Sequence, residues 1–158
     1  YIADLNGWMR FVAMQNHYNL VYREEEREMI PYCQDAGVGI IPWSPLARGF
    51  LAGNRTPDKG GDTTRSKTDD LAHNYYYQQN DFDTLDRVIE LAKRLGTKPA
   101  QIALACMLHK LGITAPIIGA SKAAHLQDAI DAMTIKLTGA DIEFLETPYT
   151  PHPVFGHT

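Results

Sequence analysis

The sequence predicts an α/β fold built from parallel strand–helix–strand units. Three short apolar segments, 11–14, 38–41 and 115–121, do not alternate polar with apolar residues, so both faces of each strand should be covered. Segments with helical periodicity separate them. Strands that alternate with helices pair in parallel. The chain has 158 residues, enough for one domain with a core.

The first long helix is expected over 22–37. Its first turn carries three consecutive glutamates, 24–26, which suit the positive end of the helix dipole. Gly37 stands where a left-handed glycine commonly ends a helix. Pro31 lies inside this range, and we expect it to kink the helix.

The second strand should end near Ile41. Pro42 and Pro45 follow it, and proline lacks the backbone N–H that a strand inside a sheet needs. The residues that follow should form an irregular loop at the carboxyl end of a strand, where ligands bind in α/β folds. A long loop is also expected over 53–80, which has no periodic apolar pattern. Loops of this length are uncommon unless they cover a site or are disordered.

Four further helices and an irregular tail are predicted in the second half, at 83–96, 97–112, 123–133, 138–147 and 148–158. Thr97 is expected to cap the helix that contains Pro99 in its first turn. That helix is largely apolar and should be well buried.

Composition excludes several classes of function. A net charge of −4 argues against a general binder of nucleic acid or anionic membranes. No apolar run approaches the roughly 20 residues of a membrane span, and no signal peptide is visible. Tyr1 is not Met, so we expect that residues precede it. Cys33 and Cys106 have no CxxC spacing, which predicts buried free thiols in a reducing, cytoplasmic compartment.

Each predicted strand ends in residues suited to contact a ligand. In chain order these are Gln15 and Asn16, then Trp43, Ser44, Leu46, Arg48 and Gly49, then Gly119, Ala120, Ser121 and Lys122. The last set is a turn of small residues that enters a helix, where free N–H groups and the positive dipole end favour phosphate. The alternative is that Ser121 simply caps this helix.

Four segments carry a family resemblance: MQNHYNL, IIPWSPLARGFLAG, TKPAQIALA and PIIGASKAAHLQDAI. They resemble the aldo-keto reductase superfamily, in particular the branch of fungal reductases and potassium-channel β subunits. The resemblance extends from about Arg10 to Tyr149. It implies a TIM (β/α)8 barrel, of which this chain is the C-terminal part with barrel strands six to eight, incomplete as given. It also implies reduction of an aldehyde or ketone by NADP(H).

The same resemblance assigns no catalytic residue here, because the family's Asp, Tyr, Lys and His tetrad lies in the N-terminal half. It does imply cofactor contacts. Gln15 would bind the nicotinamide carboxamide, and Trp43 would line the nicotinamide end. The pyrophosphate loop would consist of Ser44, Pro45, Leu46 and Arg48.

The adenosine end of the implied cofactor site shows two departures from the family. The 2′-phosphate would lie against Gly119, Ala120, Ser121, Lys122 and His125, and the adenine against Asp128 and Arg65. His125 stands where Arg or Gln is common, and its charge depends on pH. Ala129 replaces an Asn beside the adenine.

Two further hypotheses remain beside the enzyme. The chain is alternatively a non-catalytic module that binds nucleotide or a partner. It is also conceivable as a fragment that folds only as a homo-oligomer, because three parallel strands leave two open edges. A small carbonyl compound would meet the loop 53–80 and the tail 148–158, with Val154 or Phe155 at the pocket mouth. His17 is expected to line the loop or the substrate pocket.

Overall fold

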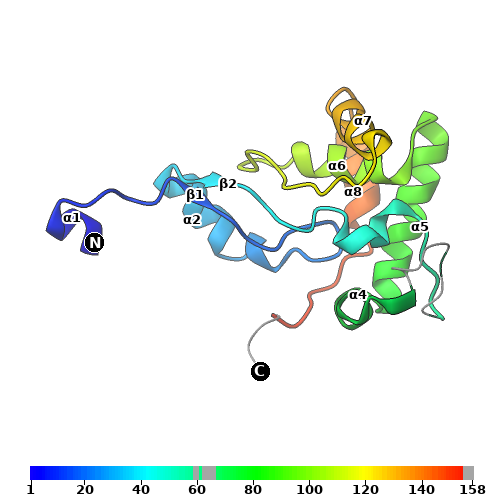
Figure 1. Cartoon of the computed structure of the whole chain (residues 1–158), viewed down its shortest axis with the longest axis horizontal. Helices are drawn as coiled ribbons and strands as arrows, with labels where there is room; N and C mark the ends of the chain where they lie inside the picture. The colour runs from blue at the N-terminus through cyan, green and yellow to red at the C-terminus, as the bar shows by residue number, and fades with distance from the viewer. Residues whose placement is uncertain (59–60, 62–66, 155–158) are drawn as a thin grey trace.

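The computed structural model describes residues 1–58, 61 and 67–154. Arg65 and Phe155, both named above, lie outside the described residues. An amino-terminal arm with the short helix α1 (Ile2–Asn6) extends away from a body made mostly of helices (Figure 1). A small parallel sheet lies between arm and body.

The sheet confirms the predicted α/β class with parallel pairing, but its strands are shorter than expected. β1 (Ala13–Met14) pairs with β2 (Gly39–Ile40), with Ala13 opposite Gly39 and Met14 opposite Ile40. Pro42 does not interrupt the pairing with β1, because the N–H groups of Ile41 and Trp43 on either side of it donate to the carbonyls of Met14 and Asn16 over 2.9 and 2.8 Å.

The third predicted strand, 115–121, does not form. This segment runs beside β2, and the backbone N–H of Ile117 donates to the Pro42 carbonyl over 2.8 Å. The N–H of Ile40 donates to the Thr114 side-chain oxygen (3.1 Å) rather than to a carbonyl. Pro116 removes another donor, so the segment follows the sheet without a regular ladder.

The helix predicted over 22–37 divides into two elements. A 3₁₀ turn, η1 (Glu24–Glu26), precedes the helix α2 (Met29–Ala36). The predicted kink at Pro31 is wrong, because Pro31 is the third residue of α2. An N–H at that position has no partner within the helix, so the proline removes no hydrogen bond. Gly37 ends α2 in the left-handed conformation, with φ 66°, as predicted.

Part of the predicted loop 53–80 is helical. The helix α4 (Asp70–Tyr75) forms there, and the Asp69 carboxylate caps it by accepting the Ala72 N–H. The helix α5 (Gln79–Leu95) also begins four residues earlier than expected. The polar sequence concealed α4 because, within residues 70–76, only Ala72 and Tyr76 are fully buried in the core.

The remaining helices build the body. α6 (Pro99–Leu108) packs between α5 and α7 (Ala123–Ala132), and α8 (Gly139–Glu146) packs on α5. The predicted Thr97 cap is wrong: α6 begins after Lys98, whose N–H donates to the Gln101 side chain over 2.9 Å. A threonine does cap a different helix, since the Thr138 hydroxyl oxygen accepts the Asp141 N–H at the start of α8.

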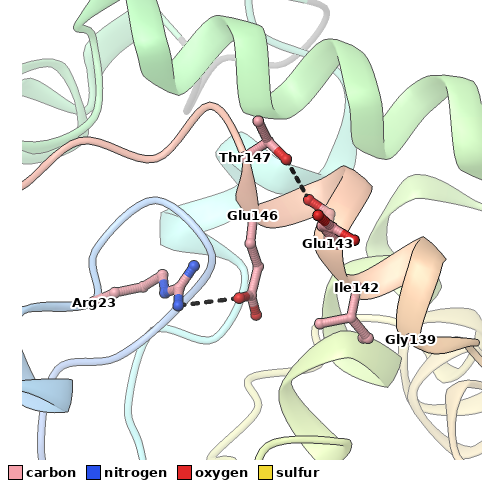
Figure 2. A pocket seen from close by; sticks show the side chains of 6 residues that line it. All are labelled: Arg23, Gly139, Ile142, Glu143, Glu146 and Thr147. Atoms are coloured by element: carbon pink, nitrogen blue, oxygen red, sulfur yellow. Dashed lines mark hydrogen bonds and ion pairs between the residues drawn. The ribbon is translucent and has the colours of Figure 1, made fainter.

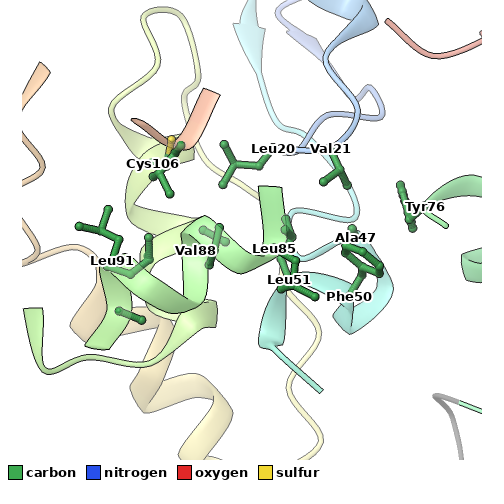
Figure 3. Close-up of a cluster of buried hydrophobic side chains, with 14 of the residues drawn as sticks. Leu20, Val21, Ala47, Phe50, Leu51, Tyr76, Leu85, Val88, Leu91 and Cys106 are labelled. Atoms are coloured by element: carbon green, nitrogen blue, oxygen red, sulfur yellow. The ribbon is translucent and has the colours of Figure 1, made fainter. Parts of the chain in front are cut away.

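The main core lies where these helices meet the loop after β2. Figure 3 shows Phe50 and Leu51 beside Leu85 of α5, and Val88 of α5 and Tyr76, which follows α4, belong to the same cluster. Both cysteines are buried and free, as predicted. None of the described helices is long and apolar enough to cross a membrane.

Candidate functional site

The ends of the three predicted strands lie side by side. The backbone N–H of Trp43 donates to the Asn16 carbonyl over 2.8 Å, and the Ile117 N–H donates to the Pro42 carbonyl over the same distance. The residues that follow β1, follow β2 and precede α7 therefore form one row. Sequence reasoning predicted these three exits separately, and the backbone hydrogen bonds place them together.

The middle exit has an unusual backbone. Ser44, Ala47 and Arg48 all have positive φ, at 57°, 48° and 56°, although none is glycine. Each such residue costs about 1–2 kcal/mol. Residues of this kind persist only where their surroundings hold them, and they cluster at ligand-binding sites. The loop is therefore held in a conformation that its sequence alone disfavours.

Three polar side chains from outside the loop hold it. Asn19, fully buried after β1, donates from Nδ2 to the Ser44 carbonyl oxygen over 3.0 Å. The Asp69 carboxylate accepts from Nε of Arg48, at 2.9 Å to Oδ1 and 3.0 Å to Oδ2. Arg55 donates from Nη2 to the Arg48 carbonyl oxygen over 2.9 Å.

Within the loop, Ser44 Oγ accepts from the Arg48 N–H over 3.2 Å. Pro45 is buried, and Leu46 is half-buried against the main core. The second half of the Ser44–Gly49 loop is also the start of the 3₁₀ element η2 (Ala47–Ala52). The loop and η2 are therefore held together. These hydrogen bonds hold the predicted pyrophosphate loop in one backbone conformation.

A stack of flat side chains supports the same exit. The imidazole of His17 lies between the rings of Trp43 and Tyr22, with ring centroids 4.1 Å apart on each side and interplanar angles of 10° and 13°. His17 is only 8% exposed, so it packs inside the loop rather than opening to a pocket. Burial lowers the pKa of His17 to about 4. It is therefore neutral near pH 7.

The first exit places Gln15 on the surface and Asn16 inside. Gln15 is exposed, at the edge of the row. The Oδ1 oxygen of the buried Asn16 has no hydrogen-bond partner among residues 1–58, 61 and 67–154. Burial raises the pKa of the neighbouring Glu25 carboxyl, although a hydrogen bond from Asn16 opposes the shift. A buried amide oxygen without a partner is costly, which suits a position that meets a ligand.

The third exit is open. Gly119, Ala120, Ser121, Lys122 and His125 are all exposed. The alternative in which Ser121 caps α7 is wrong, since Lys122 occupies the cap position and makes no side-chain cap bond. The turn therefore remains accessible to an anion.

The two adenine-end residues differ in outcome. Asp128 forms an ion pair with Lys98, whose Nζ lies 2.7 Å from Oδ1. An adenine contact would have to share that carboxylate. Arg65 lies outside the described residues, so its predicted place over the adenine stays a prediction.

A shallow hollow of about 470 Å3 lies elsewhere, between Arg23 and α8 (Figure 2). Its floor carries the ion pair of Arg23 with Glu146, 3.1 Å apart. Lys110 pairs with the same Glu146, and Glu26 lies 2.7 Å from Arg23. Arg23 and Lys110 are therefore already paired with glutamates, and none of the described residues that line the hollow is aromatic. The row of strand exits is the better candidate site.

The C-terminal tail packs against Tyr22, on the side of the stack away from Trp43. His152 is buried, with Nε2 3.0 Å from Asp81 Oδ1 and Nδ1 3.0 Å from the Thr150 carbonyl oxygen. Its ring meets Tyr22 edge-on at 6.5 Å, and Tyr22 in turn lies on His17. No local sequence pattern predicted this docking. Val154, named above as a contact, is exposed beyond it.

Comparison with known proteins places these features in context. The sequence model of the aldo/keto reductase family matches residues 1–147. The aryl-alcohol dehydrogenase candidate C750.01 of Schizosaccharomyces pombe is 50% identical over 98% of this chain and 46% of its own length. Versiconal hemiacetal acetate reductase of Aspergillus parasiticus is 42% identical over 97% of this chain and 44% of its own length. The chain thus spans less than half the length of these relatives.

A solved structure is also similar. The crystal structure of a thermostable aldo-keto reductase in complex with the inhibitor epalrestat aligns with a TM-score of 0.64 and 26% identity. The alignment covers 88% of this chain and 40% of that one.

Proposed function

This chain belongs to the aldo/keto reductase family, and on that premise we propose that it forms the NADP(H)-binding part of an oxidoreductase that reduces an aldehyde or ketone to an alcohol. The observation that carries the proposal is the row of three strand exits, with the strained Ser44–Gly49 loop at its centre. In this proposal the segments 11–14, 38–41 and 115–121 are strands six to eight of a (β/α)8 barrel.

The proposed path of the cofactor follows the row. The nicotinamide lies at Gln15 and Trp43, an amide that offers a donor and an acceptor beside a flat ring. The pyrophosphate lies along the loop of Ser44, Pro45, Leu46 and Arg48. The fixed backbone of that loop supports the assignment, because a preorganised loop loses little entropy when it binds.

The adenosine end of the path lies at the exposed turn before α7. Gly119, Ala120 and Ser121 offer backbone N–H groups there, and Lys122 and His125 add a cation and a titratable ring. Asp128, and Arg65 outside the described residues, complete the proposed adenine contacts. A preference for NADP(H) over NAD(H) follows from the cationic side chains at this end.

The chemistry of the family requires an Asp, Tyr, Lys and His tetrad, and no residue of this sequence is assigned to it. We therefore propose that this chain contributes cofactor contacts, that it alone is inactive, and that the compartment is cytoplasmic. The carbonyl substrate is a small molecule of unspecified structure.

One observation favours a second candidate function. Met9, Phe11 and Val12 are 89%, 91% and 74% exposed along the arm that leads into β1. β1 continues this apolar segment, and in the described part of the chain its edge away from β2 pairs with no strand. Exposed edges of this kind pair with other chains. The chain by itself would then be a nucleotide- or partner-binding fragment that folds as a homo-oligomer, and its mass in solution decides this.

The test of the cofactor proposal is NADPH binding to the full chain, followed by tryptophan fluorescence, with NADH as the control. Saturable binding with NADPH preferred supports the proposal. Lys122→Ala should reduce that preference by weakening NADPH more than NADH. Equal, weak effects of both nucleotides on the fluorescence would overturn it.

A further inference from the structure

We propose that His17 is a positioning residue, whose imidazole holds the indole of Trp43 flat for the nicotinamide ring. The inference deepens the proposed function and rests on it. It assigns a role to a histidine that sequence reasoning placed only as a residue lining the loop or the pocket. Three features support this role: the stacking of His17, its protonation state and the second face of Trp43.

The stacking is nearly parallel on both sides. His17 lies 4.1 Å from Trp43 at 10° and 4.1 Å from Tyr22 at 13°. Backbone pairing sets the register, because His17 and Trp43 form a parallel bridge between the two exits. A flat ring held at van der Waals distance on one face leaves Trp43 little freedom to rotate.

Hydrogen bonds fix the imidazole in its own plane. Nε2 of His17 lies 2.5 Å from the hydroxyl oxygen of Tyr76 and 3.4 Å from Nδ2 of Asn19. The amide nitrogen of Asn19 only donates, so Nε2 accepts in that contact, and the Tyr76 hydroxyl, whose pKa burial raises to about 12, keeps a proton that it can donate to the same nitrogen. Nε2 is therefore an acceptor, and the proton of the neutral ring lies on Nδ1.

The surroundings of His17 argue against a role in proton transfer. The titratable side chains that face it are the tyrosines Tyr22, Tyr75 and Tyr76, and burial alone lowers its pKa. No carboxylate in the described part of the chain hydrogen-bonds to it. A neutral, nearly buried ring without an acidic partner is suited to hold a neighbour in place.

The proposed nicotinamide stacks on the second face of Trp43. Its side chain is half-buried, and among residues 1–58, 61 and 67–154 no ring other than that of His17 stacks on it. An offset-stacked aromatic pair contributes about 0.5–1.5 kcal/mol beyond the area it buries. Nicotinamide is a flat ring of matching size, so Tyr22, His17, Trp43 and nicotinamide would form one continuous stack.

The experiment uses the full chain with Trp8→Phe, which leaves Trp43 as the only tryptophan. Trp8 is exposed on the arm and contacts none of these rings in the structure. In this background His17→Ala removes the stack, and His17→Phe keeps a flat ring but removes the acceptor for Tyr76. Near-ultraviolet circular dichroism of Trp43, urea unfolding and NADPH titration are measured on each variant.

We expect His17→Ala to lose the Trp43 dichroism signal and to weaken NADPH binding about 3- to 10-fold. His17→Phe should lower stability yet keep both the signal and the affinity. Phe82→Leu, in the core and away from Trp43, is the matched control, which should lower stability alone.

Each other outcome counts against a specific claim. Equal loss of affinity in His17→Ala and His17→Phe, or none in either, overturns the positioning role. Loss of affinity in Phe82→Leu would show that general destabilisation is responsible, which also overturns it. If the parent chain shows the dichroism signal but binds no NADPH, the proposed cofactor site fails, and the positioning role falls with it.

Discussion

Nδ2 of Asn19 donates a hydrogen bond to the backbone carbonyl oxygen of Ser44, 3.0 Å away and 25 residues later in the chain. The Oδ1 oxygen of the same amide accepts the Val21 N–H over 3.0 Å. One buried side chain therefore fixes the turn after β1 and the turn after β2 relative to each other. It links the two exits on which the proposed nicotinamide end depends.

Replacing Asn19 with Ala should lower the free energy of unfolding by about 2–3 kcal/mol, because two hydrogen bonds are lost and the Ser44 carbonyl loses its partner. Urea denaturation measures this. Asn74→Ala, at an exposed position of α4, is the control and should change stability by a few tenths of a kcal/mol at most. Similar effects of the two substitutions would contradict the linking role of Asn19.

Asp69→Asn should destabilise the chain by about 3 kcal/mol. The carboxylate pairs with Arg48 and lies 4.0 Å from Nη2 of the buried Arg55, so its removal leaves buried positive charge less compensated. Thermal or urea unfolding provides the measurement. Asp70→Asn, exposed at the next position, removes the same charge outside the pair and should cost well under about 1 kcal/mol. If Asp70→Asn lowered the free energy of unfolding as much as Asp69→Asn, the Asp69 carboxylate would not be compensating the charges of Arg48 and Arg55.

His152 should make tail docking depend on pH. Burial lowers its pKa, but the hydrogen bond and charge of Asp81 and the Thr150 carbonyl outweigh this, and the net pKa is raised. The folded state therefore binds the proton more tightly than the unfolded state. The stabilisation is fully present below the unfolded pKa of about 6.5 and is lost as pH rises through the folded value.

His152→Gln tests this dependence. Relative to the native chain it should cost more stability at about pH 5.5 than at about pH 8.5, as urea midpoints will report. His109→Gln is the matched histidine control at an exposed position, without a carboxylate partner in the described part of the chain. A cost in His152→Gln that stays constant with pH would show that the Asp81 pair is not charged.

Pro31→Ala distinguishes a first-turn proline from a helix-kinking one. A proline inside a helix destabilises it, so its replacement would stabilise the chain by about 3 kcal/mol. At the third position of α2 the substitution should instead lower stability by about 0.4–1 kcal/mol, through the greater freedom of the unfolded chain. Urea unfolding gives the sign, and a gain in stability would show that Pro31 strains the helix.

Local patterns predicted much of this molecule. Gly37 ends α2 in the left-handed conformation, as its position after a helical segment indicated. The apolar segments at 11–14 and 38–41 form the parallel pair. These features depend on residues within a few positions of one another, which is the range over which capping and periodicity act.

Features that join distant segments were not predictable in the same way. The helix α4 has a polar sequence, and it forms because Asp69 caps it and Tyr76 reaches the core beside Phe50. The docking of His152 on Asp81 joins residues far apart in the chain. No local pattern marks such a partner, because each residue by itself looks like an ordinary loop residue.

The sequence by itself determined the α/β class, the order of most helices and the residue types at the three strand exits, because periodicity, capping and family motifs are local properties. Only the tertiary structure decided that the exits form one row and that His17 lies between Tyr22 and Trp43. It also decided that Ser44, Ala47 and Arg48 adopt positive φ. A disfavoured backbone persists only when contacts from elsewhere hold it, and here Asn19 and Asp69 provide them.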